Sequence, residues 1–101
     1  MNVTMLLAIA EPNRLRIVEL LRHEPRSVND IAARLHMHQP QASKHLKVLN
    51  EAGLVKAHAK AQKRIYSLEP QPFADLEAWL QTFDHKHWNQ RLDKLDNQLR
   101  G

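Results

Sequence analysis

The sequence contains no cysteine, two glycines and five aromatic residues among its 101 residues. Without cysteine, a disulfide framework and any thiolate site for metal or redox chemistry are excluded, and because small secreted domains often need disulfides, we expect a cytoplasmic protein. The longest apolar run is formed by the six residues 5–10, and no Lys or Arg precedes it. We therefore expect neither a membrane span nor a signal peptide. So few aromatic residues in so short a chain predict a thin core, which favours self-association.

Positive charge is concentrated in the middle of the chain. The net charge of +4 divides into zero for residues 1–33, +6 for residues 34–64 and −2 for residues 65–101. A basic segment of this kind favours a polyanionic partner and is the first feature expected of a nucleic-acid-binding protein. Two other interpretations stay open, namely a solvated basic face and a surface that binds an acidic protein.

The distribution of proline and glycine predicts one domain, residues 1–101, made of helices with short joints. An apolar helix is expected over residues 1–10. A second helix begins at Pro12, because proline is tolerated in the first turn, and it ends before Pro25.

Residues 28–52 have the pattern of a helix-turn-helix. Ser27 and Asp30 have the spacing of a capping box and begin its first helix. His36 falls in the turn, where a histidine tolerates the positive φ that a turn can require. The second helix, residues 39–52, has an apolar face formed by Ala42, Leu46 and Leu49.

A hairpin is expected over residues 54–68. Gly53 is placed where a helix needs a left-handed residue to end, with Leu54 as its hydrophobic companion. Residues 54–58 and 64–68 then form the two strands, and the polar, basic residues 59–63 join them. The hairpin tip is therefore basic.

The last element, residues 72–99, carries an apolar stripe at steps of three and four, which shifts by one position at Trp88. As one unbroken helix it would be about 42 Å long, more than a small domain needs for its own core. We expect the helices 1–10 and 72–99 to form a dimer interface, although a monomeric core is an alternative for some of these residues. The predicted interface residues are Leu6, Leu7, Phe73, Leu76, Leu80, Phe83, Trp88, Leu92 and Leu95.

Three segments resemble the signature of a known family. These are residues 39–49 (QPQASKHLKVL), residues 51–55 (EAGLV) and residues 64–68 (RIYSL), and the opening of residues 11–17 (EPNRLRI) extends the match. They are similar to ArsR/SmtB-type winged helix-turn-helix repressors. The resemblance implies a mainly α fold with a small β-hairpin, in the order of four helices, hairpin and helix. It also implies a homodimer that represses transcription from a palindromic double-stranded DNA operator, usually until an effector loosens it.

Two groups of residues are candidates for DNA contact. Glutamine can bond adenine bidentately, serine can bond several base edges, and lysine can bond guanine or phosphate, so the start of the helix over 39–52 is expected to enter the major groove. The basic hairpin is expected to meet phosphates or the adjacent minor groove. An ordinary solvated surface is the alternative for both groups. The candidates are Gln39, Gln41, Ser43, Lys44, His45 and Lys47 on the helix, with Lys60, Lys63 and Arg64 on the hairpin.

The sequence departs from the ligand patterns of the metal-sensing members of the family that it resembles. It lacks their cysteine pair, and residues 84–87 (DHKH) place lysine where a second ligand is expected, with no distant histidine to complete a site. We predict no metal and no cofactor, with a histidine-based metal sensor and a winged-helix protein-interaction module as alternatives. Trp79 and Trp88 are assigned to packing rather than to an effector pocket. No catalytic arrangement is visible, so we expect no enzyme.

Overall fold

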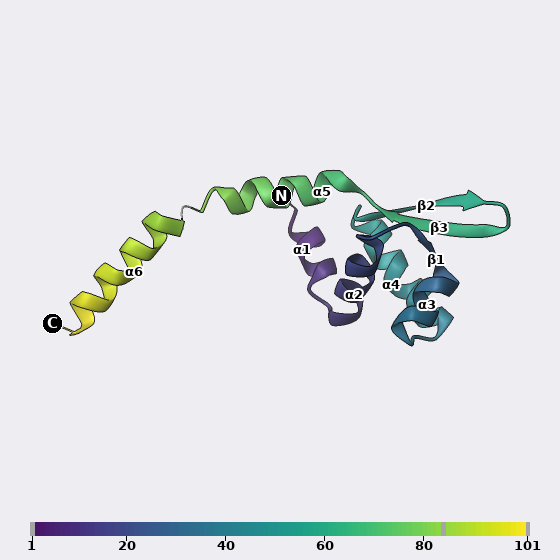
Figure 1. The fold of residues 1–101 in the computed structure, drawn as a ribbon, viewed down its shortest axis with the longest axis horizontal. Helices are drawn as coiled ribbons and strands as arrows, with labels where there is room; N and C mark the ends of the chain where they lie inside the picture. Colours follow the sequence, from purple (N-terminus) through teal and green to yellow (C-terminus); the bar gives the residue numbers. More distant parts are fainter. Residues whose placement is uncertain (1, 84, 101) are drawn as a thin grey trace.

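The computed structural model describes residues 2–83 and 85–100, without the side chains of residues 85–88. The chain folds into a winged part, formed by the first four helices and a small sheet, and an arm formed by the last two helices (Figure 1). The elements are α1 (Val3–Ile9), α2 (Pro12–Leu21), β1 (Arg26–Ser27), α3 (Val28–Leu35), α4 (Gln39–Glu51), β2 (Val55–Lys60), β3 (Lys63–Leu68), α5 (Pro70–Gln81) and α6 (His85–Arg100).

Side-chain caps fix the starts of the first three helices, since the first backbone N–H groups of a helix have no partner within it. The side chain of Asn2 accepts the N–H of Thr4 at 2.8 Å, and that of Glu11 accepts the N–H of Arg14 at 2.8 Å. The Ser27 hydroxyl accepts the N–H of Asp30 at 3.1 Å, which confirms Ser27 as the predicted cap.

Two left-handed residues end the helices of the helix-turn-helix. Gly53 has φ +77°, and the N–H of Leu54 reaches the carbonyl of Leu49 at 2.9 Å, as in a Schellman motif. His36 has φ +56° and ends α3 in the same way. Both left-handed positions were predicted from the sequence, and both are confirmed.

The core lies between the four helices of the winged part and the sheet. The predicted apolar face of α4 is confirmed, because Ala42, Leu46 and Leu49 are each 0% exposed. The other core residues are Met5, Ala8, Ile17, Val18, Leu21, Ile31, Ala32, Leu54 and Val55. This core holds α4 by one face and leaves its other face to solvent.

The sheet is larger than the predicted hairpin and its loop is shorter. Its strand order is β1-β3-β2, all antiparallel, and the added strand β1 pairs Arg26 with Tyr66. The expected loop over residues 59–63 is wrong, because Lys60 and Lys63 are paired and only residues 61 and 62 turn. Ala61 takes φ +58°, the left-handed conformation that allows a two-residue turn to match the twist of its strands.

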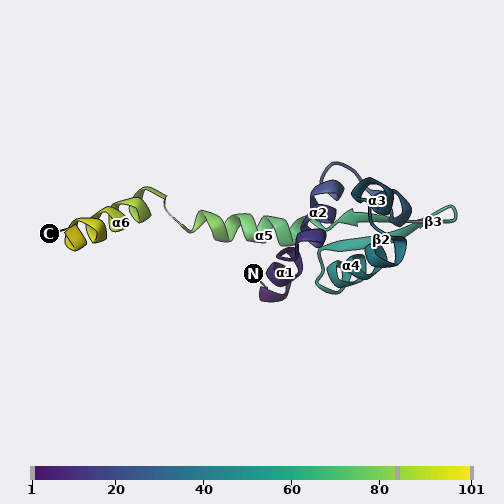
Figure 2. The ribbon, with the colours of Figure 1, turned by 90° about the horizontal axis from the view of Figure 1, so that it is seen from below.

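A single helix over residues 72–99 is also wrong. Helix α5 begins at Pro70 and ends at Gln81, and α6 begins at His85. The hydroxyl of Thr82 donates to the Trp79 carbonyl at 2.6 Å and its N–H bonds the same carbonyl at 3.0 Å, so the last turn tightens and the helix ends there. Both helices extend away from the winged part, and the long dimension of the molecule is 67 Å (Figure 2). Within the described residues no helix is long and apolar enough to cross a membrane.

Candidate nucleic-acid interface

The outer face of α4 carries most of the predicted base readers. Because Ala42, Leu46 and Leu49 are buried, the residues between them point outward. Five of the six candidates on this helix are exposed, namely Gln39, Gln41, Ser43, Lys44 and Lys47. Pro40 lies in the first turn of α4, where a backbone N–H would have no hydrogen-bond partner within the helix, so a proline is tolerated there. These five exposed candidates therefore make the part of this face from Gln39 to Lys47 largely polar and basic.

His45 differs from the other candidates on α4. Its side chain is 18% exposed, and its Nδ1 lies 3.7 Å from Oε2 of Glu11 at the start of α2. Burial opposes ionisation of Glu11, but hydrogen bonds from the backbone N–H groups of Arg14 and Asn13, together with the charge of His45, outweigh it and lower the pKa of Glu11. The structure thus places His45 against the neighbouring helix, at the edge of the exposed face.

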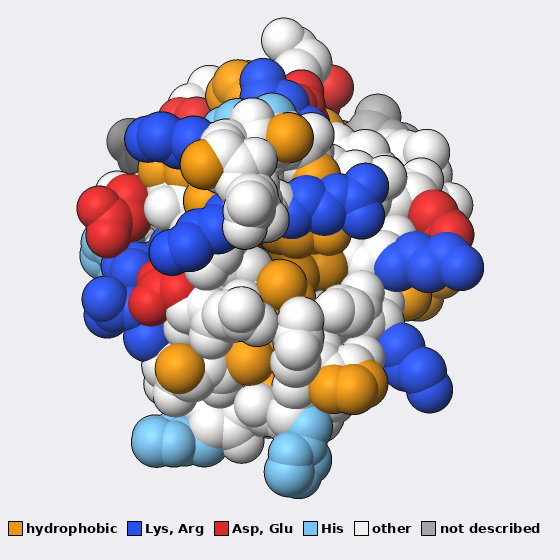
Figure 3. All heavy atoms as spheres, turned by 90° about the vertical axis from the view of Figure 1, so that its right-hand side faces the viewer, with side chains coloured by type: hydrophobic (Ala, Val, Ile, Leu, Met, Phe, Trp, Pro, Cys, Tyr) orange, Lys and Arg blue, Asp and Glu red, His pale blue; other side chains and the backbone are white. Residues whose placement is uncertain are grey.

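The hairpin ends in a cluster of exposed cations. Lys60, Lys63 and Arg64 are all exposed, and Lys60 lies directly opposite Lys63 across the two strands. Like charges in such a cross-strand pair repel, and an anion placed between them would relieve the repulsion. Figure 3 looks at the molecule from the hairpin end and shows Lys and Arg side chains on both sides of that face.

A groove of about 490 Å³ separates α4 from the hairpin. It brings predicted residues of the helix together with Arg64 of β3. Asn50 also lines it, and the Asn50 amide donates to the carbonyl of Val55 at 3.1 Å, which ties the end of α4 to the start of β2. Among the residues around this groove are Gln39, Ser43, Lys47, Asn50, Arg64 and Tyr66. Sequence reasoning missed Asn50 and Tyr66, since neither has a local signal for this position.

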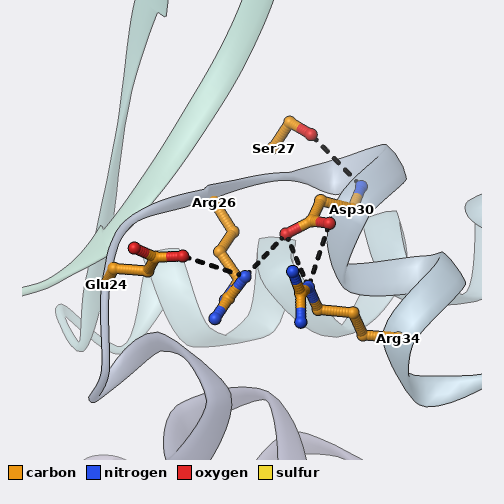
Figure 4. Close-up of polar contacts among 5 residues, drawn as sticks. All are labelled: Glu24, Arg26, Ser27, Asp30 and Arg34. Carbon is orange, nitrogen blue, oxygen red and sulfur yellow. Dashed lines mark hydrogen bonds and ion pairs between the residues drawn. The ribbon is translucent and has the colours of Figure 1, made fainter.

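An ionic network fixes the start of α3 against β1 (Figure 4). Nη1 of Arg26 lies 2.9 Å from Asp30 and 3.2 Å from Glu24, and Arg34 bonds Asp30 at 3.1 Å. The hydrogen bond from Arg26, assisted by that from Arg34, lowers the pKa of Asp30 despite burial. The Asp30 carboxylate is thus engaged by arginines, whereas a full capping box would direct it to the backbone of Ser27. Sequence reasoning missed this network, although Asp30 and Arg34 are four residues apart on one helix, a spacing that favours an ion pair.

The C-terminal end of α3 is held by an arginine of α2. Nη2 of Arg16 on α2 donates to the carbonyl of Leu35 at 3.0 Å. A cation at the last carbonyls of a helix is favourable, because those carbonyls have no partner within the helix. Helix α3 is thus bound at both ends, and the turn that follows it presents α4 in a fixed direction.

The predicted dimer residues divide into two groups. Leu6, Phe73 and Leu76 are half-buried and pack against the core of their own chain. Five others are exposed in the single chain, namely Leu7, Leu80, Phe83, Leu92 and Leu95. The side chain of Trp88 lies outside the described residues.

The described residues contain no group of three or more His, Cys, Asp or Glu side chains that could hold a metal ion. Asp84 and the side chains of residues 85–87, which carry the candidate DHKH motif, lie outside what the structure describes. Trp79 packs edge-on against Phe83, with ring centroids 5.0 Å apart, and is itself 42% exposed.

A helix-turn-helix with an exposed polar second helix, followed by a basic hairpin, defines a winged helix-turn-helix DNA-binding protein. Residues 11–57 match the model of the family described as "Bacterial regulatory protein, arsR family". The chain is 40% identical over 76 residues to the HTH-type transcriptional regulator Rv2034 of Mycobacterium tuberculosis. The aligned region covers 75% of this chain and 71% of the relative. It is 33% identical over 79 residues to the transcriptional repressor SdpR of Bacillus subtilis, covering 78% of this chain and 88% of the relative.

A solved structure with the same fold is the homodimeric winged helix-turn-helix DNA-binding domain of Mb0332 from Mycobacterium bovis, a possible ArsR-family transcriptional regulator. It superposes with a TM-score of 0.69 at 30% identity and covers 87% of this chain and 82% of that one. The chain therefore belongs to the arsR family of bacterial regulatory proteins. The predictions of a winged helix-turn-helix fold, of a DNA-binding transcriptional regulator and of a protein that is not an enzyme are confirmed.

Proposed function

We propose that this chain is a cytoplasmic repressor that binds a pseudo-palindromic operator as a homodimer. The observation that carries the proposal is the outward face of α4, where exposed amide, hydroxyl and ammonium groups lie opposite a fully buried apolar face. The B-DNA major groove is about 12 Å wide and admits one helix of this kind. The repressor name of SdpR and the homodimer of Mb0332 support the direction of regulation and the assembly.

The two parts of the interface have different tasks in this proposal. Gln39, Gln41 and Ser43 bond base edges in the major groove, because the first turns of a recognition helix reach deepest. Lys60, Lys63 and Arg64 bond phosphates beside it, which positions the protein without reading sequence. The groove between α4 and the hairpin admits the sugar–phosphate strand that separates the two contacts.

The dimer is proposed to form through α1 and the two arm helices. Exposed apolar side chains are found on all three, among them Leu7, Leu80 and Leu92. Such side chains on projecting helices are costly in water and favour burial against a second copy. Two-fold symmetry then requires two half-sites about 34–36 Å apart, or a multiple of that distance.

Binding to the DNA upstream of the protein's own gene tests the proposal. A mobility shift with that duplex should persist in excess random competitor DNA, and footprinting should show two related half-sites with the stated spacing. A transcription assay from the same promoter should show less transcript when the protein is present. A protein that shows no preference for any natural duplex, yet binds an acidic protein, would instead be a winged-helix interaction module.

A further inference from the structure

The turn between α3 and α4 carries two exposed histidines that have no task in the function proposed above. His36 ends α3 and His38 precedes α4, and both are exposed. Met37 between them packs against the core, so the turn is anchored by its middle residue and leaves the two imidazoles in solvent. In Figure 3 histidine side chains lie at the lower edge of the face that presents the hairpin, where Figure 1 places this turn.

The backbone of this turn is held in place by hydrogen bonds. The N–H of Met37 bonds the carbonyl of Ala32 at 2.9 Å, and Arg16 of α2 donates to the carbonyl of Leu35 at 3.0 Å. The side chain of His38, by contrast, makes no cap hydrogen bond at the start of α4. The position of the turn is therefore fixed, while its imidazoles remain available to a group outside the chain.

The charged side chains around the turn are mostly cations. Arg16 lies beside it, and Arg34 precedes it on α3 and bonds Asp30 at 3.1 Å. The first charged residue of α4 beyond the turn is Lys44, and the hairpin contributes Arg64 to the same groove as the start of α4. Within the described residues, the histidine that pairs with a carboxylate lies elsewhere, in the middle of α4. An anion for the turn histidines would therefore come from a partner.

We propose that the imidazoles of His36 and His38 bind operator phosphates when they are protonated, so that affinity for DNA rises as the pH falls. The proposal rests on the function proposed above and adds a third contact to those of α4 and the hairpin. With Gln39 in the major groove, the turn just before it comes to the edge of that groove, where the phosphates lie. A protonated imidazole donates from both ring nitrogens, and a charged donor bonds phosphate more strongly than a neutral one.

This contact differs from those of the hairpin because histidine changes its charge between about pH 5 and pH 8, whereas lysine and arginine do not. Since the charged form binds phosphate better, formation of the complex takes up protons. Operator affinity of the wild type should therefore fall by at least about tenfold between about pH 6 and pH 8. Each protonated imidazole also displaces a counterion, so the salt slope should be steeper at the lower pH by about 0.9 per contact.

Variants of the full chain that remove or fix the charge of the turn test the proposal. His36→Asn/His38→Gln removes both titrating groups, with asparagine chosen because it tolerates the left-handed conformation at position 36. Its operator affinity should change by less than about threefold over the same pH range. His38→Lys carries its charge throughout, so at about pH 8 it should bind at least about threefold more tightly than the wild type. His23→Gln, at an exposed position beyond the end of α2, is the matched control and should keep the wild-type pH dependence.

The salt slope separates a phosphate contact from a structural effect of the turn, because only a contact makes that slope depend on pH. A His36→Asn/His38→Gln variant with the pH dependence of the wild type would overturn the proposal. A wild-type salt slope that is equal at both pH values would overturn it too, as would a His38→Lys variant that gains no affinity. A wild type with no preference for operator over random DNA at either pH would instead refute the proposed function, so the two failures are distinguishable.

Discussion

Nδ1 of His45 on the recognition helix lies 3.7 Å from Oε2 of Glu11, the residue that caps α2. The same carboxylate oxygen accepts the N–H of Arg14 at 2.8 Å. The Glu11 carboxylate therefore caps the start of α2 and also contacts His45 of α4, which is 34 residues further along the chain. This contact links α4 to the start of α2.

The lowered pKa of Glu11 predicts loss of stability in acid. A carboxylate whose pKa is lower in the folded state contributes stability above its ordinary value of 4.5, and that contribution disappears as pH falls through the folded pKa. Glu11→Gln keeps an acceptor oxygen but removes the charge, so its melting temperature should fall less than that of the wild type below about pH 5. Glu51→Gln, at an exposed position near the end of α4, is the control and should follow the wild-type curve.

The two left-handed helix ends predict opposite effects of substitution. Gly53→Ala should lower the free energy of unfolding by about 1 kcal/mol, because a Cβ at φ +77° is strained although no atom lies within 4 Å of it. His36→Gly should raise it by less than about 1 kcal/mol, since relief of strain is partly offset by the entropy of glycine in the unfolded chain. Denaturant unfolding of both variants checks the signs, and a stabilising Gly53→Ala would contradict the assigned helix end.

The leucines of α6 predict that dimerisation and DNA binding are lost together. The Leu92→Glu/Leu95→Glu variant should raise the dissociation constant of the dimer by at least about tenfold, because charges in an apolar seam are costly to bury. Its operator affinity should fall in parallel. The control Gln90→Glu/Asn97→Glu adds the same charge on the opposite face and should leave both unchanged. Sedimentation of a monomeric wild type at micromolar concentration would refute the dimer itself.

The absence of thiolates and the lack of a His, Asp or Glu cluster in the described residues predict weak coupling to zinc. A few equivalents of zinc should change operator affinity by less than about tenfold, which is roughly 1.4 kcal/mol. Titration of the protein–operator complex with zinc measures this coupling. A larger effect that His87→Ala abolishes would support the metal-sensor alternative.

Local signals accounted for much of the fold. Ser27, His36 and Gly53 each mark a helix end through their own chemistry, and the spacing of Ala42, Leu46 and Leu49 orients α4 without any knowledge of the rest of the chain. The hairpin was also predicted from local signals, namely Gly53, two short strand segments and the polar residues between them, and the family resemblance then supported its role. These features depend on residues within a few positions of one another, so the sequence alone was sufficient.

Contacts between distant residues were not predictable in the same way. Arg26 joins the sheet opposite Tyr66, 40 residues later, and a strand of two residues has no periodicity to detect. The contact of His45 with Glu11, 34 residues earlier, also depends on the folded geometry. The bond from Asn50 to the carbonyl of Val55 spans only five residues, but it depends on how the chain turns between α4 and β2. The end of α5 at Gln81 lies inside an apolar stripe that continues at helical spacing, so the periodicity of the sequence gives no sign of it.

The central claim is that α4 reads bases while the hairpin binds phosphates, and paired affinity measurements test it most directly. Affinities of Gln41→Ala and Lys63→Ala for an operator duplex and a random duplex are compared over a range of salt concentrations. Gln41→Ala should cost about 1–3 kcal/mol on the operator and little on random DNA. Lys63→Ala should weaken both complexes and reduce the salt slope by about one unit per lost contact, or about two in a dimer. If Gln41→Ala loses equal affinity on both duplexes, α4 does not read bases, and the account is contradicted.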